Sequence, residues 1–309
     1  MRCEVILVDN GSSDGSVTMV RQKFPGLTVI EAQGNLGYAA GNNLGVERAA
    51  GSWIVLLNND TIVEKGWLSG LVRALEAPNV AVASSLIRTR GIPDRYYERN
   101  GTINFVGHNI MRAFDKPTEI FFAGGASLIF KRDILGKPFD DDYFAYAEDV
   151  YLSLRARFLG YEVKHVAESI VRHFGGGTSQ HEPSQRMTFY QERNRLMNMF
   201  IFFDSWTLVR LVPFFIANVV VKMFYALFSK RLSAIGILRC YAWLLLHLPA
   251  IRNKRRVLRR EKMVPDATVI RAMSGRVSNG EHLAAEIANF CSLAYCRLVG
   301  LRTIEFQGN

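Results

Sequence analysis

The chain has 309 residues, 49% of them hydrophobic, and a formal net charge of +10, so it can bury a sizeable core. That length suits one catalytic-sized domain with an appendage. The four cysteines, Cys3, Cys240, Cys291 and Cys296, form no CxxC pair, which excludes a zinc site of ordinary spacing and predicts reduced, cytosolic thiols.

The first predicted element is a buried strand over residues 4–8, and no charged-then-apolar leader precedes it, so no signal peptide is expected. Residues 9–16 form the loop at its carboxyl end, where small residues allow the backbone to approach a ligand closely. Ser12 or Ser13 is suited to cap the following helix, expected over about 14–24.

A second strand over 27–30 and a helix from about 34 to 50 come next. The helix is rich in small residues, which suits close packing against a ligand or a strand, although a plain, loosely packed helix gives the same pattern. The alternation of strand and helix predicts a parallel sheet with crossover helices. Neither GxGxxG nor GxxxxGK[ST] is present, which disfavours dinucleotide and P-loop sites.

The stretch from Trp53 to Thr61 is the most informative. Its uninterrupted apolar run over 53–57 predicts a strand buried on both faces of a parallel sheet. It ends in Asn58-Asn59-Asp60, at the sheet edge where α/β proteins bind ligands, and we expect strand 4–8 to end at the same edge. Asp60 can hold a divalent cation with phosphate oxygens and water, although a polar turn would show the same residues.

The middle of the chain is predicted to hold a helix over 66–76, a strand over 80–83 and a long binding loop over 88–119. A tight turn at Gly124-Gly125 then enters another strand. The apolar spacing of Val150, Leu154 and Phe158 indicates a helix that ends at Gly160.

Glu148 and Asp149 fall in the first turn of that helix. One of them could be a general base, whereas acidic residues also occur there simply because they complement the helix dipole. Short strands are predicted over 163–166 and 169–172. They lead to His173 and three glycines, where the loop could cradle phosphate and the imidazole could bind a metal, although a lone histidine is usually structural.

These motifs, in this order, resemble the family 2 inverting glycosyltransferases of the GT-A fold, above all their rhamnosyltransferase-type bacterial members. The resemblance covers residues 4–200. It rests on the segments 8–16, 35–43 and 56–61, followed by Gly124-Gly125-Ala126, Glu148-Asp149 and His173.

The resemblance implies an α/β fold with a mostly parallel sheet flanked by helices, and a site for a nucleotide-diphosphate sugar. Asp149 would be the base that deprotonates the acceptor, with Glu148 supporting it, and Asp60 and His173 would bind Mg²⁺ or Mn²⁺. The donor-binding residues would be Asp9, Asn10, Gly11, Asn35, Gly37, Tyr38, Asn42, Asn58 and Asn59. The acceptor-side residues would be Gly124, Gly125, Ala126, Arg193 and Asn194.

Two departures from the family accompany the resemblance. The motif at 58–60 offers one carboxylate, that of Asp60, which predicts weaker metal affinity. The family also begins with a strand and a Thr-Tyr-Asn-type loop ahead of the strand found here at 4–8, and this sequence lacks both.

The glycosyltransferase domain is expected over 1–203 and a helical, basic, membrane-associated region over 204–309. Residues 206–228 are long enough to span a bilayer, but Arg210, Asn218 and Lys222 interrupt them. We therefore expect this segment and 235–251 to lie in or dip into the cytoplasmic leaflet. Residues 252–262 would contact anionic headgroups. The alternative is a buried helical hairpin.

The sequence thus predicts an inverting glycosyltransferase on the cytoplasmic face of the plasma membrane. It would transfer a sugar, with rhamnose the suggested candidate, to a lipid-linked or glycan acceptor in cell-envelope polysaccharide synthesis. The rival hypotheses are an inactive, truncated nucleotide-sugar binder and a basic nucleic-acid-binding protein. The second lacks any recognised motif, so no nucleic-acid partner is expected. A sugar nucleotidyltransferase is disfavoured because no Gly-rich, Lys-bearing loop opens the chain.

Overall fold

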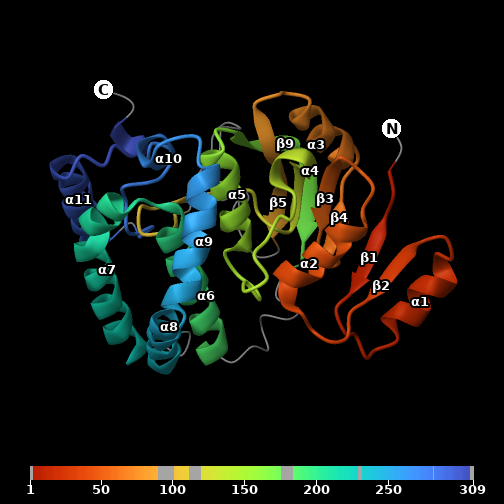
Figure 1. Ribbon diagram of the computed structural model, residues 1–309, viewed down its shortest axis with the longest axis horizontal. Helices are drawn as coiled ribbons and strands as arrows, with labels where there is room; N and C mark the ends of the chain where they lie inside the picture. The colour runs from red at the N-terminus through yellow and green to blue at the C-terminus, as the bar shows by residue number, and fades with distance from the viewer. Residues whose placement is uncertain are drawn as a thin grey trace.

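A computed structural model describes residues 3–89, 101–110, 120–174, 184–228, 232–280 and 282–306. It confirms the α/β class: most of the strands lie on the right in Figure 1 with helices packed on them, and the C-terminal helices fill the left. The main strands are β1 (Ile6–Asp9), β2 (Thr28–Glu31), β3 (Trp53–Leu57), β4 (Thr61–Val63), β5 (Val80–Thr89), β8 (Ser127–Lys131) and β9 (Glu162–His173). A small hairpin joins β6 (Thr102–Ile103) and β7 (Asn109–Ile110).

The central sheet has five strands in the order β3-β8-β5-β9-β4. Only β5 and β9 run parallel within it, whereas β8 is antiparallel to both of its neighbours and β4 is antiparallel to β9. The strand directions therefore differ from the mostly parallel sheet that the sequence suggested. The expectation was based on the early alternation of strands and helices, which indicates crossover connections. β8 and β4 are not reached through those crossovers, so they can run antiparallel to their neighbours.

β1 and β2 form a separate, parallel pair, so the expected shared sheet for 4–8 and 53–57 is not found. Helix α2 (Gly37–Arg48) lies between β2 and β3 in the chain order and packs against β1. Its small residues permit that contact: a Cβ added at Gly45 would lie 3.0 Å from Val8. The close packing predicted for this helix is confirmed. Helix α1 (Ser16–Lys23) borders the same pair.

The bounds predicted for the strand at 53–57 are confirmed, but burial on both faces is not. Ile54 and Leu56 are buried, whereas Trp53 and Leu57 are 37% and 43% exposed. This alternation arises because β3 is an edge strand of its sheet, paired only with β8 among the described strands. β8 is the strand buried on both faces, with Leu128 and Ile129 fully covered from opposite sides.

Helices cover both faces of the central sheet. Helix α3 (Trp67–Leu75) packs on β5 and β9 through Leu71 and Leu75 and closes a small core on one face. Helices α5 (Glu148–Phe158) and α6 (Ser184–Phe202) lie on the other face, over the larger core. A short helix, α4 (Arg132–Leu135), follows β8.

β9 is one irregular strand where two short ones were predicted. Its pairing with β5 shifts register between Ser85 and Leu86, and residues 167–169 form the resulting bulge. Beyond the bulge β9 also pairs with β4, which places Thr61 opposite His173. The glycines at 175–177, and Tyr96, Tyr97 and Arg99 of the predicted binding loop, lie outside the described residues.

The region after residue 203 is helical as predicted, and it shares the larger core with the sheet. Its helices are α7 (Ser205–Ala226), α8 (Ala234–Leu246), α9 (Leu248–Glu261), α10 (Asp266–Ile270) and α11 (Leu283–Leu298), followed by the turn η1 (Ile304–Phe306). Leu211, Cys240 and Met273 pack in the same core as Phe158. Among the described helices, α7 alone is long and apolar enough to cross a bilayer by itself, and α8 and α9 are bent 70° from one another.

Candidate active site

The loop after β1 is folded around the Asp9 carboxylate. Asp9 is buried, and its Oδ2 accepts hydrogen bonds from the backbone N–H of Gly11 (3.3 Å) and Ser12 (3.1 Å). Asn10 then ties this loop to the start of α2: its Nδ2 donates to Gly37 O (3.0 Å), and its Oδ1 accepts from Leu36 N (2.9 Å). Four of the predicted donor-binding positions (Asp9, Asn10, Gly11, Gly37) are thus brought together.

Two glycines make this contact between loops possible. A Cβ at Gly11 would lie 2.9 Å from the Gly34 carbonyl carbon, and a Cβ at Gly37 would lie 2.2 Å from Phe144 O. Gly37 also has φ +79, in the left-handed region that disfavours other residues. Asn35 supports the same turn, since its Oδ1 accepts from Gly37 N (2.9 Å).

Tyr38 carries the network across to the predicted acceptor side. Its hydroxyl donates to Gly125 O (2.6 Å), and Gly125 N donates in turn to Asp149 Oδ2 (3.3 Å). The predicted base is therefore connected to the predicted donor loops through the Gly124–Ala126 turn. Asn42 is different, because its side-chain amide donates to the Tyr38 carbonyl within the same helix (2.8 Å).

The same turn also holds the metal-type motif. Asn58 N donates to Ala126 O (3.0 Å), and Thr61 Oγ1 donates to Asn58 O (2.6 Å), which shapes the corner between β3 and β4. Asn59 is exposed at that corner and Asp60 is half-buried. The turn at 124–126 therefore contacts both the base and the segment that bears Asp60.

Asp60 and His173 meet although they are far apart in sequence. Phe174 N donates to Asp60 O (3.0 Å), which extends the β4–β9 pairing, and His173 Nε2 lies 3.1 Å from Asp60 Oδ1. His173 is 6% exposed, and its Nδ1 has no hydrogen-bond partner in the described chain. Sequence reasoning named both residues, but the strand pairing that joins them was not predicted.

This pair fits two protein ligands of a divalent cation. Two ligand atoms at about 2.1 Å from one octahedral ion lie about 3 Å apart, close to the separation found here. A carboxylate oxygen with an imidazole nitrogen suits Mn²⁺ at least as well as Mg²⁺. No cluster of three or more His, Cys, Asp or Glu side chains occurs in the described part of the chain, so diphosphate and water would supply the remaining ligands.

Glu148 and Asp149 occupy different environments at the start of α5. Glu148 is buried, and one of its carboxyl oxygens has no partner among the described residues. Burial, reinforced by the neighbouring Asp149 charge, raises the pKa of Glu148 to about 8, so it is protonated at neutral pH. Asp149 instead accepts hydrogen bonds from the N–H groups of Gly125 and Val150.

Helix α6 holds the loop that delivers this carboxyl pair. Tyr146 and Ala147, directly before Glu148, both have left-handed backbones (φ 73 and 61), which non-glycine residues adopt only under constraint. Asn194 Nδ2 donates to Ala145 O (2.8 Å) and Tyr146 O (2.7 Å), and Asn198 Nδ2 donates to Ala147 O (2.9 Å). Asn198 was missed by the sequence analysis, where nothing distinguishes it from a surface amide.

Arg193 and Asn194, expected on the acceptor side, are buried in the structure. Asn194 is fully covered, and Arg193 donates to Asp142 O while it lies over the rings of Phe189, Tyr190 and Trp243. Their side chains therefore support the 142–147 loop.

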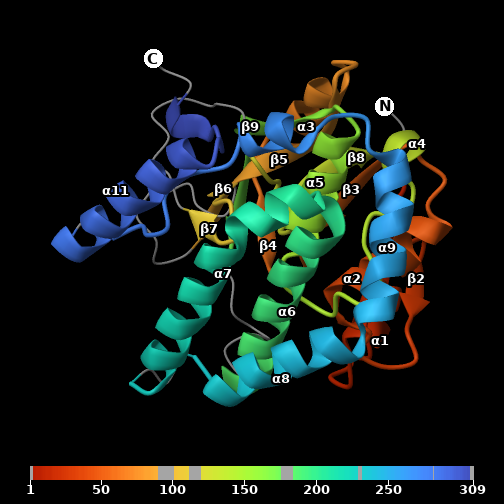
Figure 2. The same ribbon diagram turned by 60° about the vertical axis from the view of Figure 1, so that its left-hand side comes forward.

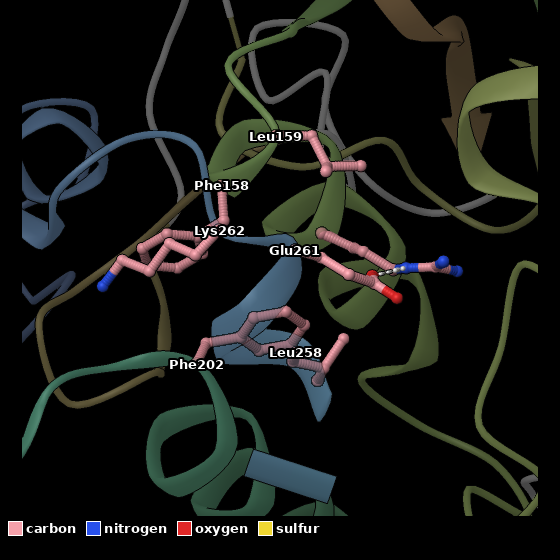
Figure 3. A pocket seen from close by; sticks show the side chains of 7 residues that line it. Phe158, Leu159, Phe202, Leu258, Glu261 and Lys262 are labelled. Carbon is pink, nitrogen blue, oxygen red and sulfur yellow. Dashed lines mark ion pairs between the residues drawn. The ribbon is translucent and has the colours of Figure 1, made fainter. Parts of the chain in front are cut away.

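A hollow near the other end of α5 is not part of this site. It lies between α5, α6 and α9, and Phe158, Phe202 and Leu258 line it (Figure 3). Its volume is about 10 Å³, hardly enough for one water and far too small for a sugar nucleotide.

Comparison with known proteins agrees with this geometry. Residues 1–137 match the family described as Glycosyl transferase family 2. Over 222 residues the chain is 22% identical to N-acetylglucosaminyl-diphospho-decaprenol L-rhamnosyltransferase of Mycobacterium tuberculosis, an alignment that covers 61% of this chain and 72% of that protein.

One solved structure shows the same fold, and a second is similar over most of this chain. GalNAc-T7 with UDP, GalNAc and Mn²⁺ matches 65% of this chain with a TM-score of 0.52 and 14% identity, and the match spans 42% of the GalNAc-T7 chain. S. aureus TarS 1-349 in complex with UDP-GlcNAc has a TM-score of 0.49 and 14% identity, with 96% of this chain and 81% of that chain covered.

The family match of residues 1–137, together with the fold, defines a glycosyltransferase of the GT-A class. Within that class, residues 1–137 match glycosyltransferase family 2.

Proposed function

We propose that the protein transfers a sugar, with inversion, from a nucleotide-diphosphate sugar to a lipid-linked or glycan acceptor in cell-envelope polysaccharide synthesis. The observation that carries the proposal is the Gly124–Ala126 turn, which is hydrogen-bonded both to Asp149 and to the segment bearing Asp60. Rhamnose as the sugar, and a polyprenyl-diphosphate acceptor, are supported by the name of the Mycobacterium tuberculosis relative.

In the proposed reaction Asp149 accepts the proton of the acceptor hydroxyl. The acceptor oxygen forms a bond to the anomeric carbon while the bond from that carbon to the diphosphate oxygen breaks, and the nucleoside diphosphate leaves with the bonding pair. Glu148, neutral beside Asp149, leaves a single negative charge in this buried pair. Asp60 and His173 would hold the divalent cation, which supplies charge stabilisation for the diphosphate when bound.

The first test is transfer from a panel of nucleotide sugars, including nucleotide-linked rhamnose, to a polyprenyl-diphosphate-GlcNAc acceptor with Mg²⁺ or Mn²⁺. Asp149→Asn should lower the transfer rate by roughly 10²–10⁴-fold, the usual contribution of a general base, while donor binding measured by calorimetry persists. Asp133→Asn is the matched control, because it also removes a first-turn helix carboxylate, on α4.

Two outcomes would contradict the proposal. Full transfer by Asp149→Asn would remove Asp149 from the reaction. Donor binding by the unmodified chain without turnover of any sugar on the panel would favour the inactive nucleotide-sugar binder. Loss of Mn²⁺-dependent nucleotide binding in Asp60→Ala, with metal-independent binding kept, would support the assignment of Asp60 as a ligand.

A further inference from the structure

Helix α7 presents a continuous apolar surface to the outside of the molecule. Ile216, Val220 and Phe224, spaced by four residues, are 60%, 61% and 66% exposed. Other exposed apolar side chains extend this row along the same helix, namely Trp206, Val209, Val212 and Val221. An apolar face this long rarely remains uncovered on a soluble protein.

The two charged residues of α7 and its asparagine all contact the rest of the protein. Arg210 Nη1 donates to Val299 O at the end of α11 (3.0 Å), and Asn218 Nδ2 lies 2.9 Å from Nε2 of His108, beside the β6–β7 hairpin. Lys222 forms an ion pair with Glu192 of α6, which is almost fully buried. One side of α7 is therefore fixed to the protein and the opposite side is apolar.

This arrangement argues against α7 as a membrane-spanning helix, even though its length and composition allow it. To cross a bilayer, α7 would have to leave Glu192 and Arg195 buried without Lys222, or carry its charged partners into the hydrocarbon region. Both are strongly unfavourable. A helix whose one face is held by the protein can instead lie in the plane of the membrane surface.

Helix α9, which packs against α8 and α6, adds positive charge to this group of helices. Its inner side is anchored: Lys254 pairs with Asp142 (2.7 Å) and Glu261 with Arg155 (3.5 Å), as the close-up of this contact shows (Figure 3). Its outer side bears Arg252, Arg256 and Arg260, which have no acidic partner within the described ranges. With Arg255 and Arg259 they line an open hollow of about 360 Å³.

Helix α8 connects the two surfaces. It follows α7, packs on α6 together with α9, and exposes Leu238, Leu245 and Leu246. Figure 2 shows α7 and α9 on either side of α6, with α8 below it.

We propose that α7, α8 and the outer side of α9 together form an in-plane docking surface for an anionic lipid bilayer. The apolar face of α7 and α8 enters one leaflet, and the arginines of α9 contact its phosphate headgroups. Charge complementarity selects a membrane over a protein partner, since unpaired arginines beside exposed leucine and valine match the headgroup–acyl boundary.

The test is co-sedimentation of the full chain with phosphatidylcholine vesicles, with and without phosphatidylglycerol. Binding is expected to need the anionic lipid. Each surface arginine should contribute about tenfold or less to the partition coefficient. The triple variant Arg252→Gln/Arg256→Gln/Arg260→Gln should therefore lower that coefficient on the order of 100-fold. The matched control is Arg48→Gln/Lys65→Gln/Lys164→Gln, which removes the same charge from exposed positions on the catalytic domain and should leave binding nearly unchanged.

The apolar contribution needs its own pair of variants. Ile216→Ser/Val220→Ser/Phe224→Ser should abolish vesicle binding, while Met19→Ser/Phe24→Ser, at exposed apolar positions in and after α1, should not. Circular dichroism verifies that each variant is folded. Equal loss in the test and control variants would overturn the assignment of this surface, and so would concentration-dependent self-association without vesicle binding, which would indicate a protein interface.

Depth measurements separate an in-plane helix from a spanning one. Trp206 reports the start of α7, and Phe224→Trp places a second reporter near its end; comparison with Trp206→Phe isolates each signal. In-plane binding predicts that lipids brominated at the same shallow depth, in the leaflet facing the protein, quench both positions. Quenching of position 224 only from the opposite leaflet would establish a spanning helix and overturn the proposal. These readouts require no enzyme activity, so they are independent of the proposed reaction.

Discussion

The two adjacent carboxyl groups at the start of α5 differ because their surroundings differ. Glu148 is buried with an unpartnered oxygen, whereas Asp149 faces two backbone N–H groups. Burial and the neighbouring charge place the pKa of Glu148 near 8, well above its ordinary value of 4.5. Glu148 is therefore protonated at neutral pH.

Glu148→Gln mimics the protonated side chain and should retain most transfer activity at neutral pH. Unmodified protein should lose activity as the pH rises through about 8, where Glu148 ionises beside Asp149, and the variant should not show this decline. The pH–rate profiles of the two proteins check this. A parallel alkaline decline in both would show that another group is responsible.

The same carboxyl group should affect stability in a defined pH window. Its folded pKa is raised, so the stability associated with the neutral form is complete below pH 4.5 and is lost as the pH rises through about 8. Thermal melts at several pH values check this. As the pH rises from 4.5 to about 8, the Tm of Glu148→Gln should increase relative to the Tm of the unmodified protein. A constant difference in Tm would contradict the raised pKa.

Gly37 is the position where a single methyl group should do the most damage to the site. Gly37→Ala would bring its Cβ into Phe144 O and break the hydrogen bond from Tyr38 N to that oxygen (2.7 Å). Gly15→Ala is the matched control, because Gly15 has nearly the same φ (+81) but open space around it. Both variants should lose about 1–2 kcal/mol of unfolding free energy because alanine disfavours the left-handed backbone. Gly37→Ala should lose distinctly more because of the added clash, and urea unfolding measures the difference.

At the level of elements, α6 acts as the support of the catalytic loop. Asn194 and Asn198 satisfy three consecutive carbonyl groups, at 145, 146 and 147, and Tyr143 donates its hydroxyl to Asn198 Oδ1 (2.8 Å). Because two of these loop residues have left-handed backbones, the loop has this shape only while α6 holds it.

Asn198→Ala should therefore destabilise the fold by about 1–3 kcal/mol, the cost of leaving buried polar groups without partners. It should also lower kcat more than it raises KM for the donor, since the base would be misplaced while the donor loops are intact. Asn253→Ala, on the exposed side of α9, is the control and should change neither. A pure stability loss with unaltered kcat would assign Asn198 a structural role only.

Much of this element structure could be predicted from local pattern. The apolar run at 53–57 and the helix after Glu148 were found because their signals lie within a few residues. The β4–β9 pairing could not be predicted, since Thr61 and His173 are joined only by the tertiary fold. For the same reason, the sequence does not predict that Asn194 is buried or that Lys222 pairs with Glu192 inside the protein.

Across the whole molecule, a buried ionic cluster joins the catalytic domain to the C-terminal helices. Glu192 of α6 pairs with Arg195 (2.8 Å) and with Lys222 of α7. Burial alone would raise the pKa of Glu192, but Arg195 and Lys222 outweigh it and lower the pKa to about 2. The cluster fixes α7 against α6 and so orients the proposed membrane surface.

Glu192→Gln should cost about 3–5 kcal/mol of unfolding free energy at pH 7, because two cations stay buried without their counter-charge. The Glu192→Gln/Lys222→Met double variant should lose less than the sum of its single changes. Glu31→Gln, which breaks the exposed pair with Arg21, should cost under about 1 kcal/mol. The Glu192 contribution is present above pH 4.5 and should vanish as the pH falls through about 2; a pH-independent effect would contradict it.

The β4–β9 ladder limits how the chain can vary in length over evolution. Side chains alternate between the two faces of a sheet, so one inserted residue just ahead of His173 would turn its imidazole away from Asp60. Insertions and deletions compatible with activity should therefore be absent from 58–63 and from 170–174, whereas the bulge at 167–169 can absorb them. We therefore expect the spacing of these segments to vary as little among relatives as Asp60 and His173 themselves.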